Sequence, residues 1–151
     1  MYGNGYSEAL IGDAIRKKKD KLIISTKVGL MPSSSKGAFS VIPIKMNRVN
    51  IVNSVDKSLR ALGIDSIDLF QLHAFDYDTP IYEICETLDY LLKAGKIRFI
   101  GLSNHDAKEY RVVKSALDEC HIPLLSFQCP FNMIARRPAD TLFPLFRDHE
   151  L

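Results

Sequence analysis

Two segments of the chain repeat apolar residues at steps of three and four. In segment 46–62 these residues are Val49, Val52, Val55, Leu59 and Leu62. Segment 80–94 repeats the spacing, opens at Pro80 and closes at Gly95, and proline and glycine are common at helix starts and ends. The period is that of an amphipathic α-helix, so both segments are predicted to be helical.

The same pattern predicts further helices. Segment 106–119 should form one, with Tyr110, Val113 and Leu117 facing inward, and a last one is expected near 139–148. A first helix is expected to end in a basic cluster, where lysines suit the helix dipole. The cluster consists of Lys17, Lys18, Lys19 and Lys21.

Four short apolar runs lie between these helices. They are Leu22–Ser25, Ile67–Leu72, the run within 96–104 and Leu124–Phe127. They do not alternate with polar residues, as is typical of strands buried on both faces. Strands separated by helices pair in parallel, which predicts an α/β fold. The pattern leaves two closures open, a doubly wound sheet or a (β/α)₈ barrel, and no Gly-x-Gly-x-x-Gly follows a strand.

A polar residue stands at or just beyond the carboxyl end of each run. Lys27 follows the first, His73 the second, Ser103 and Asn104 end the third, and Gln128 follows the fourth. In parallel α/β folds ligands bind at this end of the strands. Each residue also has a structural interpretation: a solvated lysine, a core histidine, or buried polar groups that bond one another.

Composition narrows the class of protein. With 151 residues, 46% hydrophobic and 25% charged, residues 1–151 fit one globular domain. A net charge of +2 without a basic, aromatic-rich stripe argues against nucleic-acid binding. No run approaches the roughly 20 apolar residues needed to span a membrane. The three cysteines, Cys85, Cys120 and Cys129, lack a Cys-x-x-Cys pair, which favours reduced thiols in the cytoplasm over disulfides or a metal site.

Five collinear segments closely resemble the aldo-keto reductases. They are Tyr-Gly-Asn-Gly-Tyr-Ser-Glu (2–8), Ser-Thr-Lys-Val-Gly (25–29), Ser-Leu-Arg-Ala-Leu-Gly (58–63), Asp-Leu-Phe-Gln-Leu-His (68–73) and Gly-Lys-Ile-Arg-Phe-Ile-Gly-Leu-Ser-Asn (95–104). The resemblance covers essentially the whole chain. It implies a partial (β/α)₈ TIM barrel, with this chain supplying strands three to six and their helices.

The resemblance also implies an activity. Family members reduce a small-molecule carbonyl substrate, an aldehyde or ketone, to an alcohol with hydride from NADPH, and NADH is an alternative cofactor. Carried over, Tyr2 is the proton donor, Lys27 lowers its pKa, and His73 orients the substrate oxygen. Ser103, Asn104 and Gln128 match positions that bind the nicotinamide carboxamide. His105 stands where the family commonly has an aromatic residue.

The match has departures. The family's aspartate would fall upstream of Met1, and both ends of the chain look cut, so a truncated barrel is expected. The alternative to an enzyme is a catalytically silent scaffold or regulatory protein of the same fold. Four strands taken from a closed barrel would expose two edges, so we also expect self-association.

Overall fold

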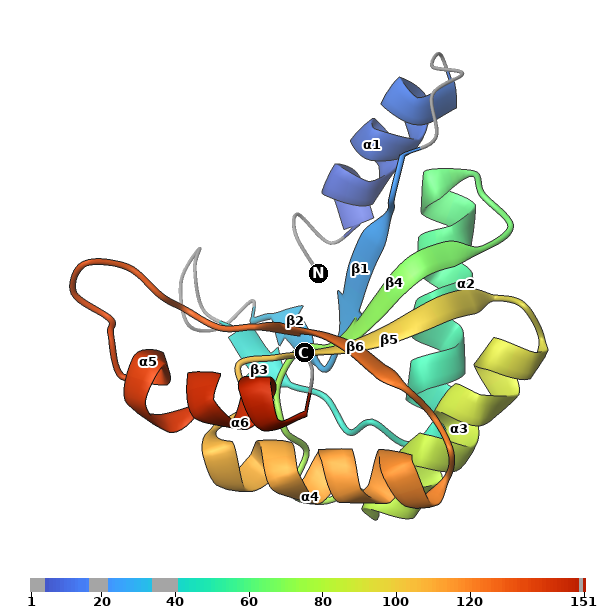
Figure 1. The fold of residues 1–151 in the computed structure, drawn as a ribbon. Coiled ribbons are helices and arrows are strands. Elements are labelled where there is room, and N and C mark those ends of the chain that lie inside the picture. Colours follow the sequence, from blue (N-terminus) through green and yellow to red (C-terminus); the bar gives the residue numbers. More distant parts are fainter. Residues whose placement is uncertain (1–4, 17–21, 34–40, 150) are drawn as a thin grey trace.

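The computed structural model describes residues 5–16, 22–33, 41–149 and 151. In chain order the elements are α1 (Tyr6–Arg16), β1 (Ser25–Val28), β2 (Leu30–Pro32), β3 (Val41–Pro43), α2 (Arg48–Leu62), β4 (Ile67–Leu72), α3 (Ile81–Lys93), β5 (Ile97–Ser103), α4 (Ala107–Glu119), β6 (Leu124–Gln128), α5 (Pro138–Thr141) and α6 (Phe143–Asp148). Strands β1, β4, β5 and β6 form a parallel sheet in that order (Figure 1). The expected alternation of helices and parallel strands is confirmed.

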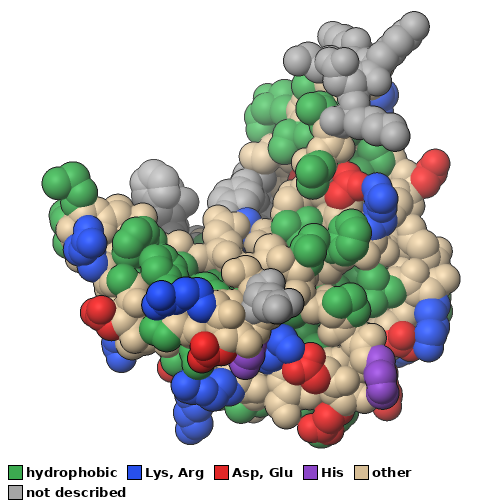
Figure 2. All heavy atoms as spheres, viewed as in Figure 1, with side chains coloured by type: hydrophobic (Ala, Val, Ile, Leu, Met, Phe, Trp, Pro, Cys, Tyr) green, Lys and Arg blue, Asp and Glu red, His purple; other side chains and the backbone are tan. Residues whose placement is uncertain are grey.

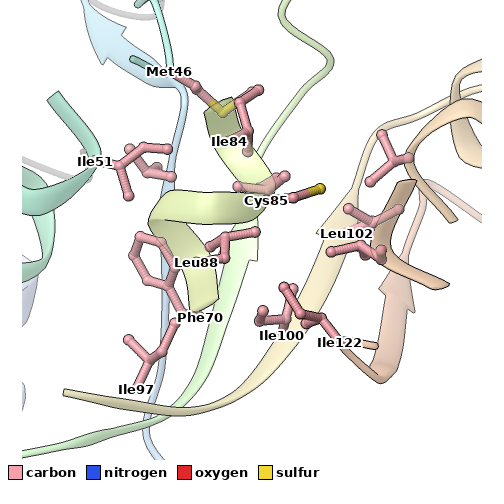
Figure 3. Packing of buried hydrophobic residues seen from close by; sticks show 14 of the residues in the cluster. Met46, Ile51, Phe70, Ile84, Cys85, Leu88, Ile97, Ile100, Leu102 and Ile122 are labelled. Atoms are coloured by element: carbon pink, nitrogen blue, oxygen red, sulfur yellow. The ribbon is translucent and has the colours of Figure 1, made fainter. Parts of the chain in front are cut away.

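The sheet is covered by helices on one face. Helices α2, α3 and α4 lie along this side, which we call the helix-facing face (Figure 1). Phe70, Ile100 and Leu102 point to this face and are buried, with Phe70 beside Leu88 of α3 (Figure 3). Residues that alternate with them point to the opposite side, which we call the inner face.

Local sequence fixes the ends of the longer helices. Asn47 caps α2 by accepting a hydrogen bond from the Asn50 amide at 2.9 Å. Gly63 ends α2 with φ of 67°, a left-handed conformation that glycine adopts without strain. Asp106 and Glu109 form a reciprocal capping box at the start of α4.

Helix α1 packs directly on the end of α2. A Cβ at Gly12 would lie 2.7 Å from the carbonyl oxygens of Ala61 and Leu62, so only glycine permits this approach. The exposed side of α1 carries Tyr6, Leu10 and Ile11, and Figure 2 shows hydrophobic side chains gathered there.

The prediction for the first strand is wrong in its position. Strand β1 begins at Ser25 and not at Leu22, and Ile23 is 84% exposed. The backbone pairs with β4 only from Ser25 onward, which places Lys27 inside the strand. As outer strands of this sheet, β1 and β6 are also only partly buried, unlike the expected strands covered on both faces.

A short antiparallel pair was not predicted. Strands β2 and β3 pair Leu30 with Pro43 and Pro32 with Val41. They lie in the long segment that follows β1, where the sequence shows prolines and serines instead of a strand pattern.

Two helix predictions need correction. Val49 is 65% exposed, and the buried side of α2 is formed by Ile51, Val55, Ser58 and Leu62. The segment near 139–148 forms two short helices, α5 and α6, with Leu142 between them. The inward positions of α4 are confirmed, since Tyr110, Val113 and Leu117 are buried. The basic cluster at 17–21 lies outside the described residues.

The pairing of β5 with β6 contains a register shift. Ile100 pairs with Leu124, whereas the next residue, Gly101, pairs with Ser126. Leu125 is therefore an extra residue on β6, as in a β-bulge.

Cys85, Cys120 and Cys129 are free thiols. None of the described helices is long and apolar enough to cross a lipid bilayer. Within the same residues no group of three or more His, Cys, Asp or Glu side chains is arranged to hold a metal ion.

Candidate functional site

The sheet gathers most of the predicted site residues at its carboxyl edge. Lys27 lies in β1, His73 directly follows β4, and Ser103 and Gln128 are the last residues of β5 and β6. Ser103 and Gln128 are paired in register, and the His73 amide donates to the Val28 carbonyl at 2.7 Å. Tyr2 lies outside the described residues.

Asn104 connects three of these strand ends. Its side-chain Nδ2 donates to the His73 carbonyl and to Ser103 Oγ, both at 3.0 Å. Its backbone amide donates to the Gln128 carbonyl at 2.9 Å. These bonds fix the ends of β4, β5 and β6 relative to one another. The same bonds match the structural alternative given above, in which these polar groups bond one another and the backbone.

Asn104 holds an unusual backbone conformation, with φ of 56°. Asparagine tolerates this left-handed region better than most residues. His105 is buried and lies edge-on to Phe75 and Phe127 at ring-centroid distances of 5.9 and 6.4 Å. This packing is that of a core aromatic ring, in the position where the family commonly has one.

His73 and Lys27 are electrostatically coupled. His73 is 7% exposed. Burial, followed by the positive charge of Lys27, lowers the pKa of His73 from 6.5 to about 4. Burial likewise lowers the pKa of Lys27 below its usual value. At neutral pH His73 is therefore a neutral imidazole, which can donate one hydrogen bond without adding charge to the site.

The loop after His73 is fixed by Asp76. Its carboxylate accepts from the backbone amides of Met46 at 2.6 Å and Asp78 at 2.9 Å. Burial alone would raise the pKa of Asp76, but hydrogen bonds from Thr79, Met46 and Asp78 outweigh it and lower the pKa. The start of α2 and the exit of β4 are thus held together beside His73.

A cleft of about 390 Å³ adjoins the ends of β5 and β6. Its polar lining includes Asn104, Asp106, Lys108, Cys129, Arg137 and Thr141. Arg136 instead stacks over the Phe131 ring, 5.7 Å from its centroid. Of the two adjacent arginines, only Arg137 reaches this cleft.

The prediction missed three polar residues on the inner face, Ser25, Gln71 and Ser126. Gln71 is buried and accepts a hydrogen bond from Ser25 Oγ at 3.1 Å. Gln71 lies two residues before His73, so the period of two along a strand could have placed it on the same face. The same period places Ser25 on the face of Lys27 and Ser126 on the face of Gln128, because the register shift in β6 lies before Ser126.

The polar groups at the sheet edge fit a primary carboxamide. Such a group needs a donor for its oxygen and an acceptor for its NH₂. Gln128 is exposed and offers both, while Ser103 contributes a hydroxyl. The donor set is therefore suited to the carboxamide of a nicotinamide ring.

Comparison with known proteins decides the family. The Aldo/keto reductase family model matches residues 1–151. The chain belongs to the aldo/keto reductase family. The fold is accordingly part of the aldo/keto reductase barrel, as the resemblance implied, and the family membership makes the chain oxidoreductase-related.

Individual relatives agree with this assignment. The chain is 34% identical to Aldo-keto reductase YhdN of Bacillus subtilis, covering 99% of this chain and 43% of YhdN. It is 31% identical to Aldo-keto reductase yakc [NADP(+)] of Schizosaccharomyces pombe, covering 100% of this chain and 44% of that relative.

A solved structure is also similar. The glycerol dehydrogenase AKR11B4 from Gluconobacter oxydans superposes with a TM-score of 0.85 at 31% identity, covering 99% of this chain and 44% of that protein. The chain thus spans about half the length of the aldo/keto reductases it matches.

Proposed function

We propose that this chain carries catalytic residues for the reduction of aldehydes or ketones to alcohols with NADPH, with NADH as the alternative donor. In the proposed reaction Tyr2 would give its proton to the carbonyl oxygen of the substrate. Membership of the aldo/keto reductase family supports the oxidoreductase class. The placement of Lys27, His73, Ser103 and Gln128 at the carboxyl edge of one parallel sheet is the observation that supports the site assignment.

In this proposal Lys27 makes Tyr2 a competent acid. A tyrosine with a pKa near ~10 gives up its proton reluctantly at neutral pH. A nearby ammonium stabilises the phenolate, which lowers the tyrosine pKa and eases proton transfer. Lys27 projects from the inner face of β1, where desolvation strengthens such an interaction.

His73 would orient the substrate. Because the pKa of His73 is held at about 4, the imidazole stays neutral at neutral pH and donates a hydrogen bond to the carbonyl oxygen. A charged imidazolium would instead be repelled by the Lys27 ammonium. The Asp76 hydrogen bonds keep the loop beyond His73 in place.

Ser103, Asn104 and Gln128 would hold the nicotinamide carboxamide. The bound nicotinamide supplies the hydride. The role of these three residues is to fix which ring face meets the substrate. Asn104 already bonds Ser103 and the His73 backbone, so it would act mainly by holding the Ser103 hydroxyl in place.

A chimera tests the proposal directly. Residues 1–151 replace the matching part of YhdN, and NADPH oxidation is followed with a panel of aromatic and aliphatic aldehydes. We expect turnover that falls by about 10²–10⁴-fold in the Tyr2→Phe variant, the usual contribution of a positioned general acid. Lys27→Met should also lower kcat.

Lys93→Met is the matched control for the lysine. Lys93 lies on α3, is exposed and pairs with Asp89 of the same helix at 2.6 Å, so its removal should leave kcat unchanged. A folded chimera that binds NADPH but reduces no aldehyde, or one whose turnover survives Tyr2→Phe, would contradict the proposed function and favour a silent scaffold.

A further inference from the structure

One row of residues crosses the inner face beneath the site. Strand register places Lys27 beside Gln71, Gln71 beside Gly101, and Gly101 beside Ser126. Paired residues of neighbouring strands point to the same face of a sheet. Lys27 therefore has Gln71 as its direct neighbour on the inner face.

Gln71 is tightly held in this row. It is 4% exposed, and Ser25 Oγ, one layer below on β1, donates to its Oε1 at 3.1 Å. On the other side of Gln71 lies Gly101, which has no side chain. A Cβ there would lie 3.0 Å from Gln71 Cγ and would clash with Ser126 Oγ. Glycine at 101 thus leaves the space that the Gln71 side chain occupies.

A glutamine in this position has a physical consequence for its neighbour. A buried polar side chain is costly unless it is hydrogen-bonded, and the Gln71 oxygen accepts from Ser25, which lies on the same strand as Lys27. A carboxamide dipole beside a half-buried ammonium partly replaces the water that the ammonium has lost. An apolar residue of similar size could not do so.

We propose that Gln71 is a positioning residue for Lys27, with its carboxamide, anchored by Ser25, supporting the Lys27 side chain on the inner face. This inference rests on the proposed role of Lys27 but concerns residues outside the implied catalytic set. Gln71 acts through Lys27 and does not itself contact the reacting atoms.

Few other charged groups surround Lys27 in the described ranges. His73 on β4 is coupled to it, and Glu8 of α1 and Lys57 of α2 line a cleft with it. Strands β5 and β6 place Gly101, Ser103, Ser126 and Gln128 on this face, and none of the four titrates. The pKa of Lys27 therefore depends on His73, Glu8 and Lys57 as well as on Gln71.

The test is the titration of Lys27 itself, followed by NMR of the 151-residue chain with lysine labelled at Cε and Nζ. The signal is assigned by its loss in Lys27→Arg. We expect Gln71→Leu to lower the pKa of Lys27 by about 0.5 or more, because the ammonium loses a polar neighbour. Gln71→Glu should raise it by a similar amount, because an anion favours the charged form.

Leu72→Val is the matched control. Leu72 neighbours Gln71 on β4 but points to the helix-facing face, where it is 1% exposed. A general disturbance of β4 would shift the Lys27 pKa in this variant as well. Opposite shifts in the two Gln71 variants with none in Leu72→Val support the proposal.

An unchanged Lys27 titration in both Gln71 variants, or equal shifts in Leu72→Val, would overturn it. Because the titration is read without turnover, its outcome is separate from that of the chimera. An inactive chimera would contradict the proposed function and leave the Gln71 result standing.

Discussion

The two faces of the parallel sheet differ sharply although they share one backbone. On the helix-facing face Phe70, Ile100 and Leu102 are completely buried against α3 and α4. On the inner face the positions toward the carboxyl edge are polar or small, as at Gln71 and Gly101, whereas Leu69 and Phe99 lie one layer below them. Scaffold and site are thus separated by single residue steps, and substitutions one position apart should affect different properties.

The largest expected effect contrasts two phenylalanines. Phe70 is buried on the helix-facing face, whereas Phe99, which shares the inner face with Leu69, is 42% exposed. We expect Phe70→Ala to lower the free energy of unfolding by about 3–5 kcal/mol. Phe99→Ala should cost about 1 kcal/mol or less, because the Phe99 side chain buries less apolar area on folding. Urea unfolding of the 151-residue chain, followed by circular dichroism, measures both.

Equal losses for the two phenylalanines would break the comparison. They would mean that the inner face of this chain is as well covered in solution as the helix-facing one, for example by self-association. Light scattering on the same samples separates that case from a wrong assignment of faces.

Acidification should lower the free energy of unfolding through His73, at the carboxyl edge of the inner face. The folded protein holds the pKa of His73 at about 4, against 6.5 for an ordinary histidine. Between these pH values the unfolded chain binds the extra proton, so the free energy of unfolding falls as pH drops from 6.5 to 4. It levels off below pH 4, after a total loss of up to about 3 kcal/mol. Urea titrations across this range give the slope.

His105 contributes with the same sign, because burial also lowers its pKa. The His73→Asn and His105→Asn variants separate the two contributions. A slope that persists unchanged in His73→Asn and disappears in His105→Asn would assign the acid sensitivity to the core below the helices and not to the site.

Gly101→Ala sharpens the comparison by testing how closely the inner row is packed. The added Cβ would meet Ser126 Oγ and Gln71 Cγ. We expect a loss of about 1–3 kcal/mol in the free energy of unfolding. Combining it with Ser126→Gly should recover part of the loss, and a double-mutant cycle measures this coupling. Strict additivity would show that the two residues do not touch.

The smallest effect is expected at the start of α4. Asp106 accepts the amides of Lys108 and Glu109, both at 2.8 Å. Asp106→Ala should therefore cost about 1 kcal/mol. Asp118→Ala, which removes only an exposed pair with Lys114, should cost about 0.5 kcal/mol or less. Similar costs for both would mean that the cap adds little to the hold of α4 on the sheet.

Much of the scaffold could be predicted from the chain. Strand β4 coincides with the apolar run Ile67–Leu72, and α3 lies within one residue of the predicted segment. These elements combine a strong period with clear boundaries such as Pro80 and Gly95. The collinear motifs likewise indicated the family.

The misses have non-local causes. Whether Leu22 or Ser25 begins β1 depends on where the backbone meets β4, and no local pattern records that pairing. Strands β2 and β3 support only each other and contain prolines. Val49 fits the helical period of α2, yet the buried side depends on which helices pack against it. The assigned roles of Tyr2, Lys27, His73, Ser103, Asn104 and Gln128 remain predictions.

Leu125 is the extra residue that shifts the register of β6 against β5. Because this one extra residue is absorbed between Leu124 and Ser126, Phe127 joins the aromatic layer with Tyr110 and Phe146, and Gln128 falls on the side of Ser103. Deleting Leu125 would turn the bulge into a regular ladder and leave Ser126, Phe127 and Gln128 with the same partners. In evolutionary terms, the bulge is a place where the strand can lose one residue and keep its binding surface, whereas the same loss inside the regular ladder of β4 would exchange the faces of the residues beyond it.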